Sequence, residues 1–294
     1  MPVPPGLGPH CVGRRVVVRR VLPGQVGPSG GPAMTDVLGV CTAWGAGRVV
    51  VRPESGAEVE IAIADIVSGK PVPPRPSMRD RVPPAEAQTR ALALWPDLAI
   101  APLGAWTLRA SDTSTARRAN SVLAMTAPGV PDALEAVVAH YRGLGRRPIA
   151  AVLPETDEEA LFLGAGWVPE SPDGPTLFQV ASVAHTRRIV RAVPGVQVDL
   201  AEDGDLVVAR VGDRATGIAA YSRDWLGMRG IEVEPAHRRQ GLGLALVAAL
   251  LGWGAERGAS TAYLQVLSNN PPALGLYAGL GFRTHHAYRY LAEP

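Results

Sequence analysis

Two arginines and two glycines stand directly before an apolar segment in the run VEPAHRRQGLGLALVAALL, residues 233–251. The start of a helix leaves backbone N–H groups unpaired and has the positive end of the helix dipole, so such residues there are suited to binding an anion. No lysine or hydroxyl residue follows directly after Gly241 and Gly243, which excludes a phosphate loop for a nucleoside triphosphate. Leu246 stands where a dinucleotide fingerprint has its third glycine. The spacing therefore indicates an anion site of another kind.

The same residues have the spacing V-x-P-x-x-R-x-x-G-x-G, which resembles the acetyl-CoA signature of the GCN5-related N-acetyltransferases. The two glycines allow the backbone to approach a pyrophosphate closely, and Pro235 closes the strand that is expected to end at Val233. The resemblance implies that acetyl-CoA is the cosubstrate and that it is bound by Val233, Arg238, Arg239, Gln240, Gly241, Leu242 and Gly243. The alternative is a basic surface turn in front of a core helix.

A second motif lies downstream in AYLQVLSNNPPALGLYAGLGF, residues 262–282. Its strand, Asn, helix, Tyr and Gly-Phe order resembles the second half of the same family's signature, with N-x-x-A-x-x-L-Y beginning at Asn270 and ending at Tyr277. The resemblance implies that Asn270 hydrogen-bonds the pantetheine arm and that Tyr277 protonates the departing CoA thiolate. The alternative for Tyr277 is an ordinary core residue.

Acetyl transfer needs a neutral amine, a polarised thioester carbonyl and an acid for the departing thiolate. The resemblance implies that backbone N–H groups near Val233 stabilise the oxyanion. Many members of the family have a carboxylate or histidine base at the position that is Gly227 here. Glu232, on the same strand, is the leading substitute for the base, and Asp224 is the second candidate. The alternative for Glu232 is a solvated strand residue or a contact with a charge on the substrate.

Composition limits the other classes of function. The 294 residues suffice for about two domains. The chain has 29 Lys and Arg and 27 Asp and Glu, a net charge of +2 that is too balanced for a dedicated nucleic-acid binder.

Cys11 and Cys41 form no C-x-x-C pair and no histidine cluster has metal spacing, so we expect no metal and two reduced cysteines in the cytoplasm. The pair His285–His286 is expected to be exposed. The longest apolar run, residues 242–255, is shorter than the roughly 20 residues of a membrane span.

The remaining segments predict an α/β (α+β) chain of several parts. Short β-branched segments separated by Gly, Pro and Ser predict a small SH3-like β-barrel over residues 10–69, followed by a proline-rich linker over residues 70–84. Residues 85–190 have the order strand, helix, strand, helix, Gly-aromatic, which repeats the order of residues 191–294. We therefore predict a tandem acetyltransferase-like fold whose first copy is degenerate and whose second copy binds acetyl-CoA.

The turn before the helix expected to begin at Pro131 explains why the first copy is called degenerate. Pro128 and Pro131 have no N–H group to offer, and the charge of Asp132 repels phosphate. We therefore expect one cofactor site per chain.

The leading hypothesis is an acetyl-CoA-dependent N-acetyltransferase that moves an acetyl group to a primary amine of a small molecule or a protein, by direct transfer in a ternary complex. The alternative is a non-catalytic acyl-CoA sensor or a subunit that recruits a partner. A third possibility is nucleic-acid binding by the barrel through Arg14, Arg15, Arg19 and Arg20, but strand alternation divides these side chains between two faces. No membrane partner is expected, and the acceptor and the oligomeric state stay open.

Overall fold

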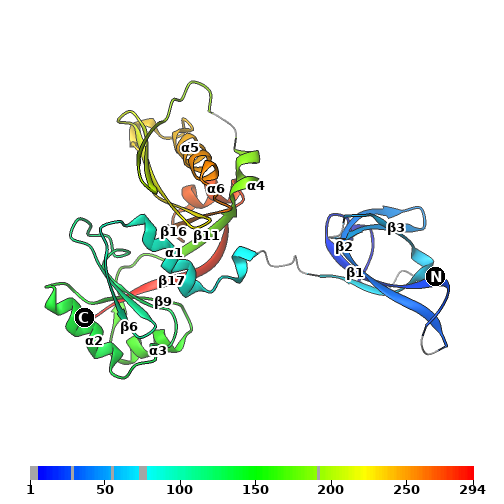
Figure 1. Cartoon of the computed structure of the whole chain (residues 1–294), viewed down its shortest axis with the longest axis horizontal. Coiled ribbons are helices and arrows are strands. Elements are labelled where there is room, and N and C mark those ends of the chain that lie inside the picture. The colour runs from blue at the N-terminus through cyan, green and yellow to red at the C-terminus, as the bar shows by residue number, and fades with distance from the viewer. Residues whose placement is uncertain (1–5, 28–29, 54–55, 73–77, 191–192) are drawn as a thin grey trace. The chain divides into compact units, whose positions relative to one another are not determined.

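The computed structural model describes residues 6–27, 30–53, 56–72, 78–190 and 193–294. The chain forms two compact units that divide between Ser77 and Met78 (Figure 1). Among the described residues, no helix is long and apolar enough to cross a membrane.

The smaller unit is a five-stranded antiparallel sheet with the order β4-β3-β2-β1-β5. Its strands are β1 (Arg15–Val26), β2 (Pro32–Gly45), β3 (Arg48–Pro53), β4 (Val59–Ala62) and β5 (Ile66–Pro71). A short 3-10 turn, Ile63–Asp65, separates β4 from β5. Alternate valines of β1 and β3 point into the core, as the two-residue period of a strand requires. Both cysteines, Cys11 and Cys41, are free and fully buried in that core.

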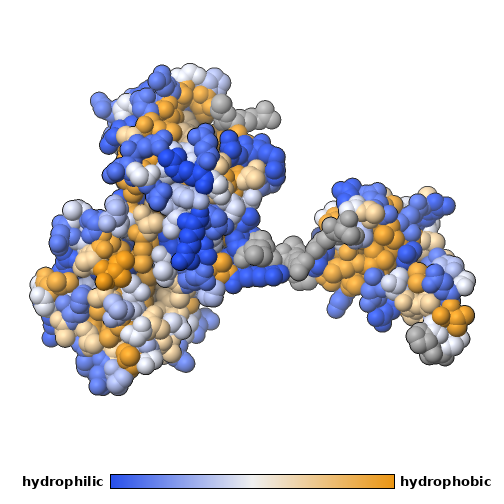
Figure 2. Space-filling model, in the orientation of Figure 1, coloured by the Kyte–Doolittle hydropathy of each residue, from blue (hydrophilic) through white to orange (hydrophobic). Residues whose placement is uncertain are grey.

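The surface of the smaller unit also shows apolar side chains (Figure 2). The exposed large apolar residues described in this unit are Val12, Val26, Met34, Leu38, Val40 and Val67. Arg19 is on the outer side of β1 and its guanidinium pairs with Asp36, 2.8 Å from Nε to Oδ1.

The first half of the larger unit contains the strand–helix–strand–helix order that the sequence predicts, together with a helix and a hairpin that it did not. Its elements are α1 (Pro84–Arg90), η4 (Ala91–Leu94), β6 (Ala99–Leu103), β7 (Trp106–Ala110), β8 (Val122–Ala124), α2 (Ala133–Gly143), β9 (Ile149–Val152), α3 (Asp157–Gly164), β10 (Val168–Pro169) and β11 (Thr176–Ser182). Thr156 begins α3 as a typical N-cap, since its side chain accepts a hydrogen bond from Glu159 N.

The second half contains the two motifs. Its elements are α4 (Val183–Ile189), β12 (Asp199–Asp203), β13 (Leu206–Val211), β14 (Ala215–Ser222), β15 (Trp225–Val233), η5 (Pro235–His237), α5 (Leu242–Glu256), β16 (Thr261–Leu267), α6 (Pro271–Gly279) and β17 (Arg283–Ala292). The helix α5 is apolar over most of its surface because it packs against β13, β14 and β15 on one face of the sheet. The short helices α1 and η4 pack with residues of β11, β14, β15 and β16 in a separate apolar cluster.

The two halves share one sheet because they exchange strands. The order is β12-β13-β14-β15-β16-β11-β17-β9-β8-β7-β6, so β11 of the first half lies between β16 and β17 of the second. The long strand β17, red in Figure 1, pairs with β11 through its residues 283–288 and with β9 through its residues 289–292. These pairings cross the boundary that the sequence predicts between residues 190 and 191.

Candidate active site

The candidate site begins where two parallel strands separate. β15 and β16 pair from Trp225–Thr261 to Met228–Leu264, and no pair joins them further along. β15 continues to Val233, and its pairing with β14 is irregular on the way. Arg229 pairs with Ile218 and Glu232 with Thr216, so β15 has one more residue than β14 between these two pairs. An extra residue of this kind bends a strand and leaves backbone groups outside the ladder. The ends of β15 and β16 therefore diverge, and the region between them, with backbone groups outside the ladder, is named the cleft here.

The side chains near the end of β15 alternate between two faces. Ile231 and Val233 pack against the core cluster that contains α5. Glu232, between them, is exposed and points to the opposite face. On that opposite face, the guanidinium of Arg229 donates to Leu94 O at 3.0 Å and lies 4.2 Å from the ring centroid of Trp95. The predicted base candidate Glu232 therefore lies at the cleft, away from the helix α5.

The loop between β15 and α5 leaves the helix start open to a ligand. Arg239 and Gly241 both have positive φ, 67° and 79°, and Gly241 is the N-cap of α5. No side chain caps this helix, and its first turn contains no acidic residue. Arg238, Arg239 and Gln240 are exposed, and Arg238 Nε donates to Val233 O at 3.2 Å, which ties the loop to the end of β15. The first N–H groups of α5 are thus free to bind an anion.

The two glycines of the loop have different surroundings. A Cβ atom on Gly241 would lie 3.1 Å from Val193 Cγ1, in a backbone conformation that already favours glycine. A Cβ atom on Gly243 would make ordinary contacts, at 3.7 Å from Val233 Cγ2 and 4.0 Å from Leu276 Cδ2. Gly243 therefore lies between the end of β15 and α6. Leu242 is buried, 2% exposed, so only its backbone can reach a ligand.

The second motif places Asn270 and Tyr277 at the two ends of α6. Asn270 is the N-cap of α6, and its Oδ1 accepts from Ala273 N at 3.3 Å. The Nδ2 group is not needed for this cap. Tyr277 is 8% exposed and its ring contacts Phe282, with the centroids 5.8 Å apart. Burial raises the pKa of the Tyr277 phenol, so the hydroxyl stays protonated at neutral pH.

The prediction of Asp224 as a second base is wrong. Asp224 precedes β15 at the end opposite the cleft, where its Oδ2 accepts from Ser260 Oγ at 2.7 Å and its Oδ1 from Arg90 at 3.3 Å. Eight residues of strand separate Asp224 from Glu232, roughly 26 Å at ~3.3 Å per residue. A carboxylate there cannot reach an amine in the cleft.

Steric contacts explain why a glycine stands at the position where many members of the family have the base. A Cβ atom on Gly227 would lie 2.3 Å from Tyr263 Oη and 3.0 Å from Leu94 Cδ1. The phenol of Tyr263 is itself held by a hydrogen bond to Arg90 O at 3.1 Å. A side chain at this position would require the ring of Tyr263 to shift, together with Leu94 of η4.

The prediction that His285–His286 is exposed is also wrong. Both side chains are half-buried on β17, and the His286 ring stacks on Phe178 with 4.9 Å between centroids. Burial, with a smaller contribution from the neighbouring His285, lowers the pKa of His286 to about 3. His286 is therefore a neutral packing residue whose Nε2 lies 3.1 Å from Gln88 Nε2.

One residue near the cleft was missed by the sequence reasoning. Arg118, in the loop before β8 of the first half, donates from Nη2 to Gln265 O at 3.4 Å and from Nε to Tyr288 Oη at 3.3 Å. Gln265 is the first residue of β16 beyond the last pair with β15. No local pattern marks Arg118, because the contact joins residues 147 positions apart.

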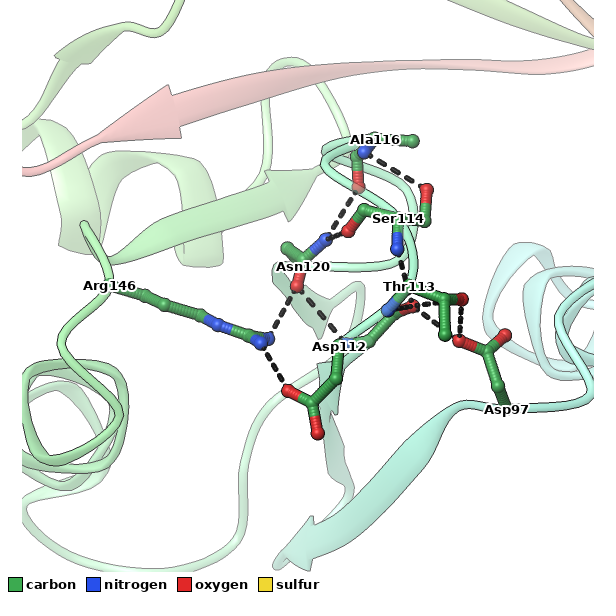
Figure 3. A network of polar contacts seen from close by, with 8 residues as sticks. Asp97, Asp112, Thr113, Ser114, Ala116, Asn120 and Arg146 are labelled. Atoms are coloured by element: carbon green, nitrogen blue, oxygen red, sulfur yellow. Dashed lines mark hydrogen bonds and ion pairs between the residues drawn. The ribbon is translucent and has the colours of Figure 1, made fainter.

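A polar network holds the loop that contains Arg118 (Figure 3). Asn120 is its centre: Oδ1 accepts from Ser111 N and from Arg146 Nη1, and Nδ2 donates to two backbone oxygens of the same loop. Asp97 accepts from Ser111 Oγ at 2.6 Å and also from Thr113. The first half therefore presents an ordered loop to the cleft of the second half.

Comparison with known proteins agrees with this geometry. Residues 167–291 match the family described as "Probable histone acetyltransferase Rv0428c C-terminal", and residues 10–70 match "Rv0428c N-terminal Sm-like domain". The chain is 27% identical to the Probable histone acetyltransferase Rv0428c of Mycobacterium tuberculosis over 309 aligned positions, which cover 98% of this chain and 95% of that protein. A stretch of 85 residues is 35% identical to the streptothricin acetyltransferase of Streptomyces lavendulae and covers 29% of this chain and 42% of that one.

A solved structure shows the same fold. The GCN5-related N-acetyltransferase from Kribbella flavida aligns with a TM-score of 0.55 at 18% identity, over 71% of this chain and 95% of its own. The chain belongs to the GCN5-related N-acetyltransferase superfamily, in the Rv0428c-like group that has an N-terminal Sm-like domain. The protein is thus an acetyltransferase, with acetyl-CoA as the cosubstrate that the family implies and an amine as acceptor. The predicted resemblance is confirmed.

Proposed function

We propose that this protein transfers an acetyl group from acetyl-CoA directly to a primary amine of a small molecule or a protein, within a ternary complex. The observation that carries the proposal is the separation of β15 and β16 after Met228 and Leu264, beside the uncapped start of α5. In this proposal the divergence of the two strands gives a path from one face of the sheet to the other. A donor on the α5 side and an acceptor on the Glu232 side can therefore meet without a covalent enzyme intermediate.

The residues present fit the pyrophosphate and pantetheine parts of acetyl-CoA. In this proposal the binding residues are Val233, Arg238, Arg239, Gln240, Gly241, Leu242, Gly243 and Asn270. The N–H groups at the start of α5 donate to the pyrophosphate, and the exposed arginines add positive charge. The free Nδ2 of Asn270 points to the use of this amide for the pantetheine arm, since the cap of α6 occupies only Oδ1.

The chain's own groups can supply each proton step. Acetyl-CoA supplies an activated acetyl thioester. Backbone N–H groups of the bent end of β15 stabilise the oxyanion, and Glu232 removes a proton from the acceptor ammonium. Tyr277 gives its proton to the thiolate, and the raised pKa keeps that proton in place until it is needed.

The architecture around the site is part of the same proposal. The N-terminal sheet, residues 10–69, is in this proposal a small barrel, which the sequence predicts as SH3-like and the matched family describes as Sm-like, and residues 70–84 link it to the rest. Residues 85–190 are a degenerate acetyltransferase copy without a cofactor, and residues 191–294 are the copy that binds acetyl-CoA. The turn in front of α2, with Pro128 and Asp132, supports one cofactor site per chain.

A thiol-release screen tests the proposed reaction. The full chain with saturating acetyl-CoA is mixed with a panel of primary amines, and free CoA is measured against the same mixture without amine. We expect amine-dependent release, with the acetylated amine detected by mass spectrometry. Tight binding of acetyl-CoA with no release for any amine would instead favour the acyl-CoA sensor.

A further inference from the structure

A pocket of about 460 Å³ lies where the loop between β10 and β11 meets β17, the start of β11 and the loops before β8 and after β9. Its polar lining is Arg117, Ser171, Asp173, Thr176, Arg289 and Tyr290, and prolines form much of the remaining wall. This volume is within the range of pockets that hold small ligands. The motifs of the sequence do not include this pocket.

The hydroxyl of Thr176 lines the pocket without a partner. Thr176 is 1% exposed, and its Oγ1 has no hydrogen bond to any described residue. A buried hydroxyl without a hydrogen bond is costly, and such groups are rare in folded proteins. Because Oγ1 is itself buried, a ligand in the pocket satisfies it once the covering side chains move aside.

The lining contains more cationic than anionic side chains. It has the guanidiniums of Arg117 and Arg289 and the carboxylate of Asp173, while Glu170 and Glu159, outside the lining, pair with the two arginines. Arg117 uses Nη1 for Glu170 at 2.6 Å, while its Nη2 makes only a 3.4 Å contact with Asp173. Arg289 uses Nε for Glu159. Each arginine therefore retains N–H groups that can donate to a carboxylate, as guanidiniums do most effectively.

A chain of hydroxyl groups connects the pocket with the cleft. Tyr290 Oη lies 3.3 Å from Tyr288 Oη, and Tyr288 in turn donates to the side-chain oxygen of Gln265. Gln265 lies at the point where β16 leaves β15. Thr176 is the register partner of Leu267, the last residue of β16. The distance across the sheet from the cleft to the pocket is about two strand spacings, roughly 10 Å.

We propose that this pocket binds the far end of the acceptor, and that the acceptor is an amine with a carboxylate roughly 10 Å from its nitrogen. The inference rests on the proposed function, because it places the amine beside Glu232 in the cleft. Arg117, Arg289 and the hydroxyls of Thr176 and Tyr290 hold the carboxylate. The first half and the exchanged strands thus determine which amine the second half acetylates.

Three matched amines test the inference on the full chain with saturating acetyl-CoA: ω-aminooctanoate, its primary amide, and α,ω-diaminooctane. Thiol release gives KM for each, and calorimetry with CoA present gives binding without turnover. We expect a KM for ω-aminooctanoate about 10-fold or more below those of the other two, since only it has the carboxylate. An amide or diamine that performs equally well or better would overturn the inference.

Two substitutions locate the effect in the pocket. Thr176→Val keeps the shape and removes the unpartnered hydroxyl, so the melting temperature stays the same or rises while KM for ω-aminooctanoate rises about 10-fold. Asp173→Asn keeps the hydrogen bonds with Ser171 and removes the only lining anion, so KM falls for ω-aminooctanoate and rises for the diamine. Asp112→Asn, at a side chain that is 99% exposed, is the control and changes neither value. An unchanged KM for ω-aminooctanoate in both pocket variants would overturn the inference.

The outcomes separate the pocket from the proposed reaction. Binding of ω-aminooctanoate that weakens in Thr176→Val, without thiol release, supports the pocket and contradicts the transfer reaction. Turnover of the diamine or the amide in preference to ω-aminooctanoate supports the transfer and contradicts the pocket. Absence of binding for all three probes also contradicts the pocket.

Discussion

The turn between β8 and α2 and the turn between β15 and α5 occupy the same place in the two halves. In each half, a strand runs beside a parallel neighbour and then leads through a turn into a helix on the same face of the sheet. The turn before α2 contains Asp132, with φ 49°, at the N-cap. Its Pro128 oxygen accepts from Ala105 N at 2.8 Å, so the β6–β7 hairpin packs against this turn. The turn before α5 has Gly241 at the N-cap and no acid.

The difference between the two turns indicates that the fold alone does not make a cofactor site. Neither helix start has a side-chain cap, but the carboxylate of Asp132 repels phosphate at the start of α2, while the turn before α5 has a glycine there and no acid. The architecture of the halves is similar, so we expect a few atoms in one turn to decide which of them binds an anion.

The largest effect is expected when the second turn is given an acid like that of the first. Gly243→Glu places a carboxylate in the first turn of α5, where a Cβ atom makes ordinary contacts and the dipole stabilises the negative charge. We expect the fold to be retained while acetyl-CoA affinity falls at least ~100-fold by repulsion of the pyrophosphate. Calorimetry with CoA and thermal unfolding measure both effects.

A control substitution on the same helix and the number of CoA sites per chain make this test more specific. Gly252→Glu, where a Cβ atom meets nothing within 4 Å, should leave binding unchanged. Gly241 is less suitable, because any side chain there meets Val193 and a positive φ. We expect one site in the wild-type chain and none in Gly243→Glu. A second site that survives the substitution would show that the first half also binds CoA.

The strand exchange predicts that the halves unfold together. Phe178, on β11 of the first half, is fully buried and its ring lies 5.2 Å from that of Tyr263 on β16. Phe178→Ala should lower the free energy of unfolding by about 3–5 kcal/mol. As denaturant is added, we expect acetyl-CoA binding to be lost in the same single transition in which the whole larger unit unfolds. Leu163→Ala, at an exposed position of α3, is the control, with a change of about 0.5 kcal/mol. Two separate transitions, with binding in the unaffected one, would contradict a shared core.

Tyr277→Phe should reduce turnover with little change in binding. Loss of the acid lowers kcat about 100-fold, while affinity for acetyl-CoA and stability stay near wild type, since the phenol makes no hydrogen bond to a described residue. Because burial raises the pKa of Tyr277, the alkaline fall in kcat should lie above the ordinary range of tyrosine and be absent from the variant. Tyr221→Phe, on β14, is the matched control. An unchanged kcat would assign the proton to another group.

Glu232→Gln is expected to give the smallest effect, about 10-fold in kcat/KM. The loss should be greatest at low pH, where most of the acceptor amine is protonated and a base is most needed. Glu234→Gln, at an exposed residue just beyond β15, is the control. A deficit that is equal at all pH values would indicate that Glu232 contacts a charge on the substrate instead.

Local features of the site could be predicted because they depend on neighbours in the sequence. Pro235 ends a strand, Gly241 begins a helix, and Asn270 caps the next helix, and each of these follows from backbone geometry within a few residues. The contact of Arg118 with Gln265 and the burial of His286 could not be predicted, since both depend on segments far apart in the chain.

The sequence by itself determined the family, and it supplied the proposals for the cofactor loop and the proton donor, because spacing within a strand–turn–helix unit specifies where N–H groups and side chains point. Only the tertiary structure decided which half supplies each strand of the sheet, and it alone brought Thr176, Tyr290 and Arg117 to one pocket. The physical reason is that strand pairing depends on complementary surfaces formed after the chain has folded back on itself. No local period in the sequence records which distant strand will be the neighbour.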